Sequence, residues 1–321
     1  MADYKAIKGH HIETVAGDPS VLQIGDIWYN STLGKLRGGK LGAGSWASGG
    51  NLNQVRRGQN GAGTSTACIS FGGGPTSETG AGGGLSETYN GSAWTEGNDL
   101  NTARNNMGAA GISTAALCFG GSPYTVNNES YDGSSWTEIA NLNTGRGSRA
   151  SAGTQTSALF ASGSAGPPGE TSVTSVESYD GSSWTEVADV NTGDDSRAGS
   201  GESNTAALVI DKGPATGIVE EWDGSSWTEV ADLNTDSAYH GSAGTTSKMI
   251  CFGGDPARAN TEEWDGSSWA EKNDLSAGRY LGAPGHSDAE DTLYAGGWTT
   301  ANTATTEEWT QAVAASSITS S

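Results

Sequence analysis

Two tyrosines and two histidines are the side chains whose types and spacing could do chemistry in this chain. His240 directly follows Tyr239, and His286 comes six residues after Tyr280. Two His and two Tyr side chains that converge can hold a copper ion for redox chemistry. The alternative is a pair of ordinary loop histidines, and we expect neither a metal site nor a cofactor.

The other reactive residue types recur at fixed places, which is typical of architecture. Asp-Gly turns occur at Asp132, Asp180, Asp223 and Asp265. Calcium could bind such turns, but Asp is also a common turn former. Arg56, Arg104 and Arg146 share one register, and Cys68, Cys118 and Cys251 fit small core hydrophobes. A catalytic site is needed once, so recurring residues predict no catalytic set and no enzyme.

The elements that carry these residues form a repeat. The segment at residues 133–143 returns at 181–191 and 224–234, with looser copies at 91–101 and 266–275. Its tryptophans are Trp94, Trp136, Trp184, Trp227 and Trp269, spaced by 42, 48, 43 and 42 residues. Each unit has a Gly-rich stretch, an apolar strand, a strand ending in an aromatic and, after a tight turn, the Trp strand. Four short strands in about 45 residues predict one blade of a β-propeller.

The two ends of the repeat region complete one another. No Gly-Ser-Ser-Trp segment follows Trp309, whereas Trp46 lies in a Trp strand that lacks the three strands before it. Joining these ends removes two open sheet edges. We therefore predict an all-β chain with a six-bladed propeller at residues 44–310, closed by an N-terminal outer strand. Residues 1–43 then form a module with a β-hairpin, and residues 311–321 a C-terminal tail.

The pattern of these units resembles a known repeat family. The Arg-start strand, the Phe-Gly-Gly or Tyr-Ala-Gly-Gly strand, the Tyr-Asp strand end and the following Trp resemble the kelch repeat. The resemblance implies a fold and not a function, because kelch propellers include scaffolds, oxidases and binding modules. The Asp-Gly turns also resemble the Asp-box of sialidases, although the Asp-to-Trp spacing is one residue shorter. A carbohydrate-active enzyme of sialidase or galactose-oxidase type and a cytosolic kelch scaffold stay open as alternatives.

Residues 24–37 do not follow the repeat and predict a β-hairpin with its turn at residues 30–34. With the Asp-Pro-Ser at 18–20, this segment resembles structural and fibre proteins of bacteriophages, especially marine ones. The resemblance implies an assembly role for residues 1–43, with Trp28 and Tyr29 as contact residues. A strand end of a seventh blade is the alternative, but no apolar Gly-Gly strand precedes it.

The loops between the second and third strands of each unit are the most varied part of the repeat. The loops between the third and fourth strands are instead near copies of Asp-Gly-Ser-Ser. A diversified face with aromatic residues is where recognition sits, although loops also simply drift. We predict that Tyr124, Trp298, Asp255 and Arg258 in these 2–3 loops bind a surface glycan or a protein ligand.

Composition narrows the class of function. The net charge of −21 and the pI near 4.3 argue against a nucleic-acid partner. No apolar run is long enough to span a membrane, and the first 14 residues lack the apolar core of a secretory signal. We predict a non-enzymatic virion structural protein of the phage fibre or decoration type, made in the host cytoplasm, or otherwise an extracellular protein. It would bind other virion proteins through residues 1–43, act in host recognition and form homo-oligomers.

Overall fold

The structure, a computed structural model, describes residues 12–75, 83–147, 150–166, 171–193, 198–211 and 217–318. These residues form strands and no helix, which confirms the prediction of an all-β chain. Within the same ranges, no helix long and apolar enough to cross a membrane occurs. The chain divides into two compact units, one of residues 1–44 and 311–321 and the other of Ser45–Thr310.

The smaller unit is one four-stranded sheet. Its strands are β1 (Glu13–Val15), β2 (Ile27–Asn30), β3 (Lys35–Leu41) and β29 (Val313–Ser317), in the order β1-β2-β3-β29. β2 and β3 pair antiparallel around a turn at residues 31–34, and β1 pairs parallel with β2. The C-terminal segment, expected to be a tail, instead forms β29 and pairs with β3 from Val313↔Leu41 to Ser317↔Arg37. This pairing satisfies an edge of the hairpin that would otherwise be open.

The larger unit contains six sheets. From the axis outward, the first sheet has β5 (Arg57–Gly63), β6 (Cys68–Gly74), β7 (Ser86–Tyr89) and β8 (Trp94–Glu96), and the second has β9 (Gly108–Ile112), β10 (Ala115–Phe119), β11 (Asn128–Tyr131) and β12 (Trp136–Glu138). The third has β13 (Arg146–Gly147) and β14 (Ser151–Thr154), then β15 (Ser157–Ala165), β16 (Thr171–Tyr179) and β17 (Trp184–Val187), and the fourth has β18 (Ala198–Ser203), β19 (Ala206–Ile210), β20 (Val219–Trp222) and β21 (Trp227–Glu229). The fifth has β22 (Gly241–Gly244), β23 (Met249–Phe252), β24 (Thr261–Trp264) and β25 (Trp269–Glu271), and the sixth has β26 (Ala283–Pro284), β27 (Asp291–Ala295), β28 (Thr306–Thr310) and β4 (Ser45–Ser48). All pairs in these sheets are antiparallel, and β13 and β14 both pair with β15.

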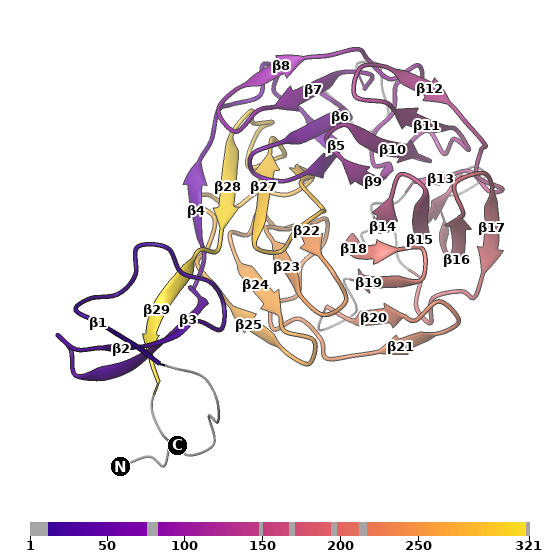
Figure 1. Cartoon of the computed structure of the whole chain (residues 1–321). Coiled ribbons are helices and arrows are strands. Elements are labelled where there is room, and N and C mark those ends of the chain that lie inside the picture. Colours follow the sequence, from indigo (N-terminus) through magenta and orange to yellow (C-terminus); the bar gives the residue numbers. More distant parts are fainter. Residues whose placement is uncertain are drawn as a thin grey trace. The chain divides into compact units, whose positions relative to one another are not determined.

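These six sheets surround a common axis (Figure 1). The inner strands β5, β9, β14, β18, β22 and β26 each contact the next one, and β26 contacts β5. Radial four-stranded antiparallel sheets around an axis fit a β-propeller.

The last sheet takes its outer strand from the other end of the repeat region. β4 pairs antiparallel with β28, and Trp46 lies opposite Trp309. This is the pairing expected from the incomplete ends of the repeat. The indole N–H of Trp46 donates to Thr261 Oγ1 of the preceding sheet at 2.9 Å. The indole of Trp94 donates in the same way to Thr306 Oγ1 at 3.0 Å, so in these two sheets the Trp strand is bonded to the neighbouring sheet.

The hydrophobic core lies between adjacent sheets and repeats with them. Phe71 of one sheet packs edge-on against Trp136 of the next at a centroid distance of 4.9 Å. Within a sheet, Tyr131 and Trp136 pack at 5.0 Å across β11 and β12. Aromatic pairs of this kind stabilise beyond their buried area, which explains how a glycine-rich chain forms a core.

Candidate functional site

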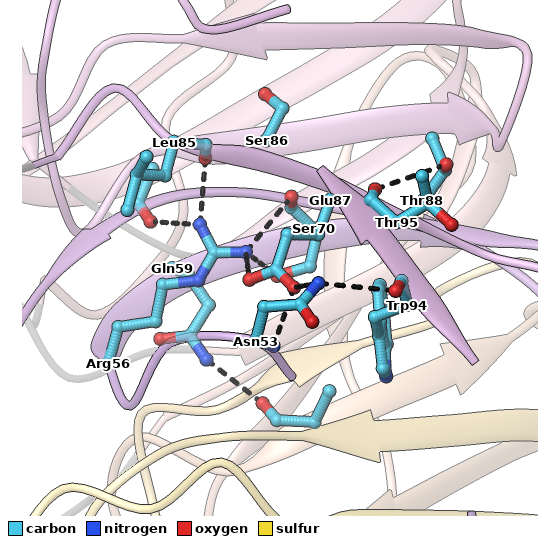
Figure 2. Close-up of polar contacts among 12 residues, drawn as sticks. Asn53, Arg56, Gln59, Ser70, Leu85, Ser86, Glu87, Thr88, Trp94 and Thr95 are labelled. Atoms are coloured by element: carbon cyan, nitrogen blue, oxygen red, sulfur yellow. Dashed lines mark hydrogen bonds and ion pairs between the residues drawn. The ribbon is translucent and has the colours of Figure 1, made fainter. Parts of the chain in front are cut away.

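A buried arginine occupies one place in four of the six sheets, as far as the described ranges show. In the first, Arg56 Nη2 lies 3.1 Å from Glu87 Oε1, and Nη1 donates to Leu85 O at 2.7 Å (Figure 2). The second oxygen of Glu87 accepts the backbone N–H of Asn53 at 2.7 Å and its Nδ2 at 2.8 Å. The equivalent pairs are Arg104–Glu129, Arg146–Glu177 and Arg279–Glu307, at 2.7, 2.6 and 2.5 Å.

These arginines are fully enclosed. Burial lowers the pKa of Arg56 to about 10, so its guanidinium is still charged at neutral pH. Each of the four is bound by a glutamate that is itself buried. None of them is therefore available to bind the carboxylate of a ligand, as a sialidase-type arginine cluster would require.

The sheet β22–β25 departs from this arrangement. Ser237 precedes Gly241 by the same four residues that separate Arg104 from Gly108. A cavity of about 10 Å³, close to the size of one water molecule, is lined there by Ser237, His240, Cys251 and Glu262 among others. Glu262 accepts the backbone N–H groups of Asn234 and Thr235, each at 2.8 Å.

The two candidate copper histidines line different cavities. His240 lines the small cavity inside the sheet β22–β25, whereas His286 lines a pocket at the axis. Tyr239 and Tyr280 stack with centroids 6.4 Å apart. Among the described residues, no group of three or more His, Cys, Asp or Glu is placed to hold a metal ion. The two histidines, weighed above as copper ligands together with the two tyrosines, thus line different cavities.

The three cysteines are buried and reduced. Burial raises the pKa of Cys68 to about 12 and that of Cys118 to about 11. Such thiols stay protonated and unreactive at neutral pH.

A pocket of about 430 Å³ opens at the axis, where the inner strands end. Its walls come from β9, β14, β18 and β22 and from the connections to the second strands. Its lining residues are Ala109–Ile112, Ala115, Ala152, Gly153, Thr154, Gln155, Thr156, Ser200–Glu202, Gly244, Thr245, His286 and Ser287. The 1–2 and 3–4 connections share one face of antiparallel sheets, so this pocket faces away from the 2–3 loops.

Residues 285–287 cross the axis and form part of the pocket. Gly285 O accepts the N–H of Gly63 at 2.7 Å, and His286 O accepts the N–H of Gly244 at 3.1 Å. Ser200 Oγ donates to His286 O at 2.9 Å, and His286 Nε2 lies 2.8 Å from Asn60 Oδ1. One connection is thereby bound to three other sheets.

The pocket lining is almost free of charge. No Lys or Arg belongs to it among the described residues, and its one acid is Glu202. Both oxygens of Glu202 accept from Thr246, its N–H and its Oγ1, at 3.2 Å each. Ile112 adds an apolar wall and is 52% exposed. The lining thus offers backbone groups, hydroxyls and an apolar patch.

The structure places Trp298 beside Tyr280 and Arg57. Its backbone N–H and C=O exchange hydrogen bonds with Tyr280 at 2.8 and 3.1 Å. The Arg57 guanidinium lies over the Trp298 ring, 4.2 Å from the centroid, and Tyr280 stacks on Tyr239. Trp298 is half-buried.

The other predicted binding residues bond to other parts of the chain. Tyr124 is half-buried at φ 57°, and its ring lies against Gly166 of the next sheet. Asp255 exchanges backbone hydrogen bonds with Ala238 at 2.7 and 3.2 Å, and the Arg258 N–H donates to Gly254 O at 2.8 Å. Asp255 and Arg258 share one loop, but Tyr124 and Trp298 contact different neighbours.

Of the two predicted assembly residues, one is in the interior of its unit. Trp28 is 3% exposed, and its indole N–H donates to Asp18 Oδ1 at 3.1 Å. Arg37 and Asn30 bind the same carboxylate, and these contacts, that of Asn30 first, lower the pKa of Asp18. Trp28 therefore cannot serve as a surface contact, whereas Tyr29 is 39% exposed.

Sequence reasoning did not identify the axial pocket. A signal was present, because Gly63, Gly111, Gly153 and Gly244 lie at or next to the ends of the inner strands with positive φ, and the last unit has His286 at this position, at φ 64°. A large residue at a position that is glycine in the other repeats indicates a local role that the repeat itself does not require.

Comparison with known proteins identifies the class of fold. No protein-family model matches the chain, and no curated protein does. Among solved structures 212 chains match. One, titled "Structure of YjhT", has a TM-score of 0.62 at 14% identity and covers 83% of this chain and 99% of its own. At that identity the likeness shows the fold alone, which is a β-propeller. The kelch-repeat and phage resemblances find no match and stay predictions.

Proposed function

We propose that the six sheets are six kelch-like blades of one closed propeller and that β4 completes the last blade. The pairing of Trp46 with Trp309 supports this, as do the contacts that lead from β5 around the axis to β26 and back. Closure matters for function because it fixes the spacing of the strands β9, β14, β18 and β22, which form the walls of the axial pocket.

The propeller, in this proposal, is a binding protein for a small uncharged ligand, and a neutral saccharide fits best. The axial pocket carries the proposal. Its volume of about 430 Å³ is within the range of small-molecule sites. Hydroxyls and backbone groups suit the hydroxyls of a sugar, and Ile112 with the neighbouring alanines suits the apolar face of a ring.

Electrostatics argue for a neutral ligand over an acidic one. No cation belongs to the described lining, and the buried arginines already bind glutamates. A carboxylated sugar would enter a strongly acidic protein without a partner for its charge. The pocket residues that titrate, His286 and Glu202, bind Asn60 and Thr246, which favours binding over acid–base catalysis.

Among the functions predicted from the sequence, a carbohydrate-directed one agrees better with the propeller likeness than the virion role does. The likeness concerns fold only, so binding and not turnover is proposed. The virion role, the extracellular location and the absence of catalysis stay predictions, and the first of these depends on residues 24–37.

A glycan array followed by calorimetric titration of the hits tests the proposal. Neutral mono- and oligosaccharides should bind, and sialylated glycans should bind less tightly. Thr154→Trp places an indole at the pocket rim and should abolish binding. Thr137→Trp, which changes another exposed threonine, on β12, is the matched control and should bind like the wild type.

Three results would contradict the proposal. One is a preference for acidic glycans. Another is binding that survives Thr154→Trp but is lost with Trp298→Ala, which changes the 2–3 loop face instead of the pocket. The third is chemical conversion of the bound sugar, which would make the chain an enzyme.

A further inference from the structure

The buried arginines bind main-chain oxygen atoms in addition to their glutamates. Arg104 Nη2 donates to Glu129 Oε1 at 2.7 Å and to Cys118 O at 3.1 Å. Cys118 lies directly opposite Glu129 in the neighbouring strand. Arg104 Nη1 donates to the carbonyl of Asn127, two residues before the glutamate, at 2.8 Å. The guanidinium is therefore held by a carboxylate and by carbonyls whose places are fixed by the strand pairing.

The same oxygen positions bind the arginine in the other three of these sheets. The carbonyl opposite the glutamate accepts from Nη2 in all of them, and these carbonyls are Ser70 O, Phe160 O and Tyr294 O, at 3.4, 2.9 and 2.8 Å. In the first sheet, Leu85 O and Gly72 O also accept from Arg56 Nη1, at 2.7 and 3.1 Å (Figure 2). Leu85 is two residues before Glu87, and Gly72 is two residues after Ser70. A cation position surrounded by oxygen atoms is thus a feature of the repeat.

The sheet β22–β25 keeps these oxygen positions although Ser237 replaces the arginine. Glu262 lies opposite Cys251 in the neighbouring strand, as the glutamates of the other sheets lie opposite their carbonyl partners. Gly253 and Asn260 stand at the other two carbonyl places. All of these residues line the cavity of about 10 Å³. The cavity therefore lies where the other sheets hold guanidinium nitrogens.

The carboxylate at this cavity is buried. Glu262 is 3% exposed and accepts the backbone N–H groups of Asn234 and Thr235 and the Nδ2 of Asn234. In the described part of the chain, no Lys or Arg lines the cavity or forms an ion pair with Glu262. Glu271 lies opposite Glu262 in β25, and its pKa is raised by burial first and then by the charge of Glu262. A buried carboxylate of this kind is stabilised by a cation.

The wall of the cavity offers acceptors in place of donors. Ser237 Oγ donates to one of the carbonyls, Gly253 O, at 3.4 Å. An ammonium ion presents only donors, as a guanidinium does, and a potassium ion binds oxygen atoms directly, whereas a water molecule also turns lone pairs toward the acceptors. Both ions are about the size of a water molecule, which is what a cavity of this volume holds.

A metal ion of higher charge fits this wall less well. Calcium and magnesium take about six or more oxygen ligands, and Glu262 is the one carboxylate among the described residues that line the cavity. Zinc would need the side chains of His240, Cys251 and Glu262 to converge. In the described ranges, no group of three or more His, Cys, Asp or Glu is placed to hold a metal ion. One negative charge among carbonyls matches one positive charge.

We propose that the cavity beside Glu262 binds one monovalent cation of the size of a water molecule, potassium or ammonium, at the place of the guanidinium of the other sheets. Glu262 also holds Asn234 and Thr235, which belong to the connection between β21 and β22. The bound cation therefore stabilises the junction between the fourth and fifth sheets. The net charge of −21 attracts cations to the protein.

Thermal melts of the full-length chain in different chloride salts test the site. In potassium chloride or ammonium chloride the wild type should melt about 2–4 °C higher than in choline chloride, whose cation is too large for the cavity. Equal ionic strength in all three salts removes general screening from the comparison. The salt that gives the larger shift identifies the preferred ion.

Two variants that act on the cavity should abolish the salt dependence. Glu262→Gln keeps the size of the side chain and an oxygen for the Asn234 bonds but removes the charge, so it should melt at one temperature in all three salts. Ser237→Arg supplies the guanidinium of the other sheets and should also lose the dependence, which keeps the test decisive where Glu262→Gln does not fold. Glu229→Gln, the same change at an exposed glutamate of β21, is the matched control and should keep the shift.

A crystal structure from rubidium chloride locates the ion. Rubidium has the charge of potassium and a similar size, and its anomalous signal should lie between the carboxylate of Glu262 and the carbonyl of Cys251. Equal melting of the wild type in all three salts would mean that water or a protonated His240 fills the cavity, and would overturn the proposal. A salt shift that persists in Glu262→Gln, or rubidium bound only elsewhere, would overturn it as well.

Discussion

The sheets β9–β12 and β22–β25 are copies of one repeat, and a buried arginine that the first contains is replaced in the second. In the first, Arg104 binds Glu129 at 2.7 Å, and Asn101 donates its N–H and its Nδ2 to the same carboxylate. In the second, Ser237 stands at the arginine position, and Glu262 keeps the equivalent bonds from Asn234. The carboxylate and asparagine are thus common to both sheets, whereas the arginine is not.

This difference separates two tasks of the network. The Asn–Glu bonds hold the segment that follows one Trp strand against the next sheet, and at the last junction the Ser276 N–H donates to Glu307 Oε2 in the same way at 2.8 Å. Arg104 fills space and neutralises the charge of Glu129. Beside Glu262, a cavity of about the size of one water molecule and polar side chains take the place of the arginine. The glutamate, which occurs in all six sheets, therefore joins neighbouring sheets, whereas the arginine position is one at which the chain can vary.

Removing the strand that is shared between the two ends of the repeat should have the largest effect. A chain that lacks residues 1–53 loses Trp46, Leu52 and the ladder to β28. We expect its free energy of unfolding to fall by about 5 kcal/mol relative to a chain that lacks residues 1–43 only. Denaturant unfolding of both chains measures the difference.

The two truncated chains leave β29 equally without its partner β3, so their difference reports on residues 44–53. Equal unfolding midpoints would show that β4 does not contribute to a closed ring.

The second-largest effect on the free energy of unfolding should come from removing the arginine, and it should distinguish the two sheets. Arg104→Ala leaves Glu129 buried without its cation, and loss of one partner of a buried ion pair costs about 3–5 kcal/mol. Ser237→Ala at the equivalent place removes only a hydroxyl and should cost about 1 kcal/mol or less. Urea unfolding of the two single variants checks this order. Similar losses in both would mean that the serine has a role equal to that of the arginine.

The repeated features could be predicted from the sequence because each of them occurs in several repeats. The Trp register gave the sheets, and the shared place of Arg56, Arg104 and Arg146 indicated architecture, in agreement with their burial. The pairing of Trp46 with Trp309 followed from counting strands.

What occurs once was harder to predict. β29 pairs with β3, which lies almost the whole length of the chain away in sequence. Its sequence, Val-Ala-Ala-Ser-Ser, has neither a flanking turn motif nor a clear alternation of apolar and polar residues that would predict a strand. The burial of Trp28 depends on Asp18, which lies ten residues away in a loop. The axial pocket is formed by several sheets together, so no local segment encodes it.

A variant at His286 tests whether this departure from the glycine of the other repeats affects the stability of the protein. His286→Gly removes the bond to Asn60, worth about 1 kcal/mol, but also relieves a positive φ of similar cost. We expect a net change in the free energy of unfolding within about 1 kcal/mol. The reverse change in a regular unit is the control: a Cβ at Gly111 would lie 2.1 Å from Ala115 O, and Gly111→Ala should cost about 1–3 kcal/mol. A larger loss for His286→Gly than for Gly111→Ala would make His286 a structural residue.

The smallest expected effect concerns the turns on the outside of the sheets. Asp132, Asp180 and Asp223 each accept from the two following serines, and these bonds lower their pKa values to about 2. For Asp265 the same bonds lower the pKa as well. A depressed folded-state pKa stabilises the protein above the ordinary value near 4, and this contribution is lost as the pH falls toward 2.

The first sheet already contains the uncharged version of this turn. Asn90 Oδ1 accepts the N–H groups of Ser92 and Ala93, each at 3.0 Å, without a titrating group. Changing Asp132, Asp180, Asp223 and Asp265 together to Asn should therefore leave stability at neutral pH nearly unchanged. Between pH 4 and pH 2 the melting temperature of the variant should fall less steeply than that of the wild type, because the lowered pKa values of the four aspartates no longer contribute. Thermal melts of both proteins over that interval measure the slopes. Equal slopes would show that the acid sensitivity comes from elsewhere in the chain.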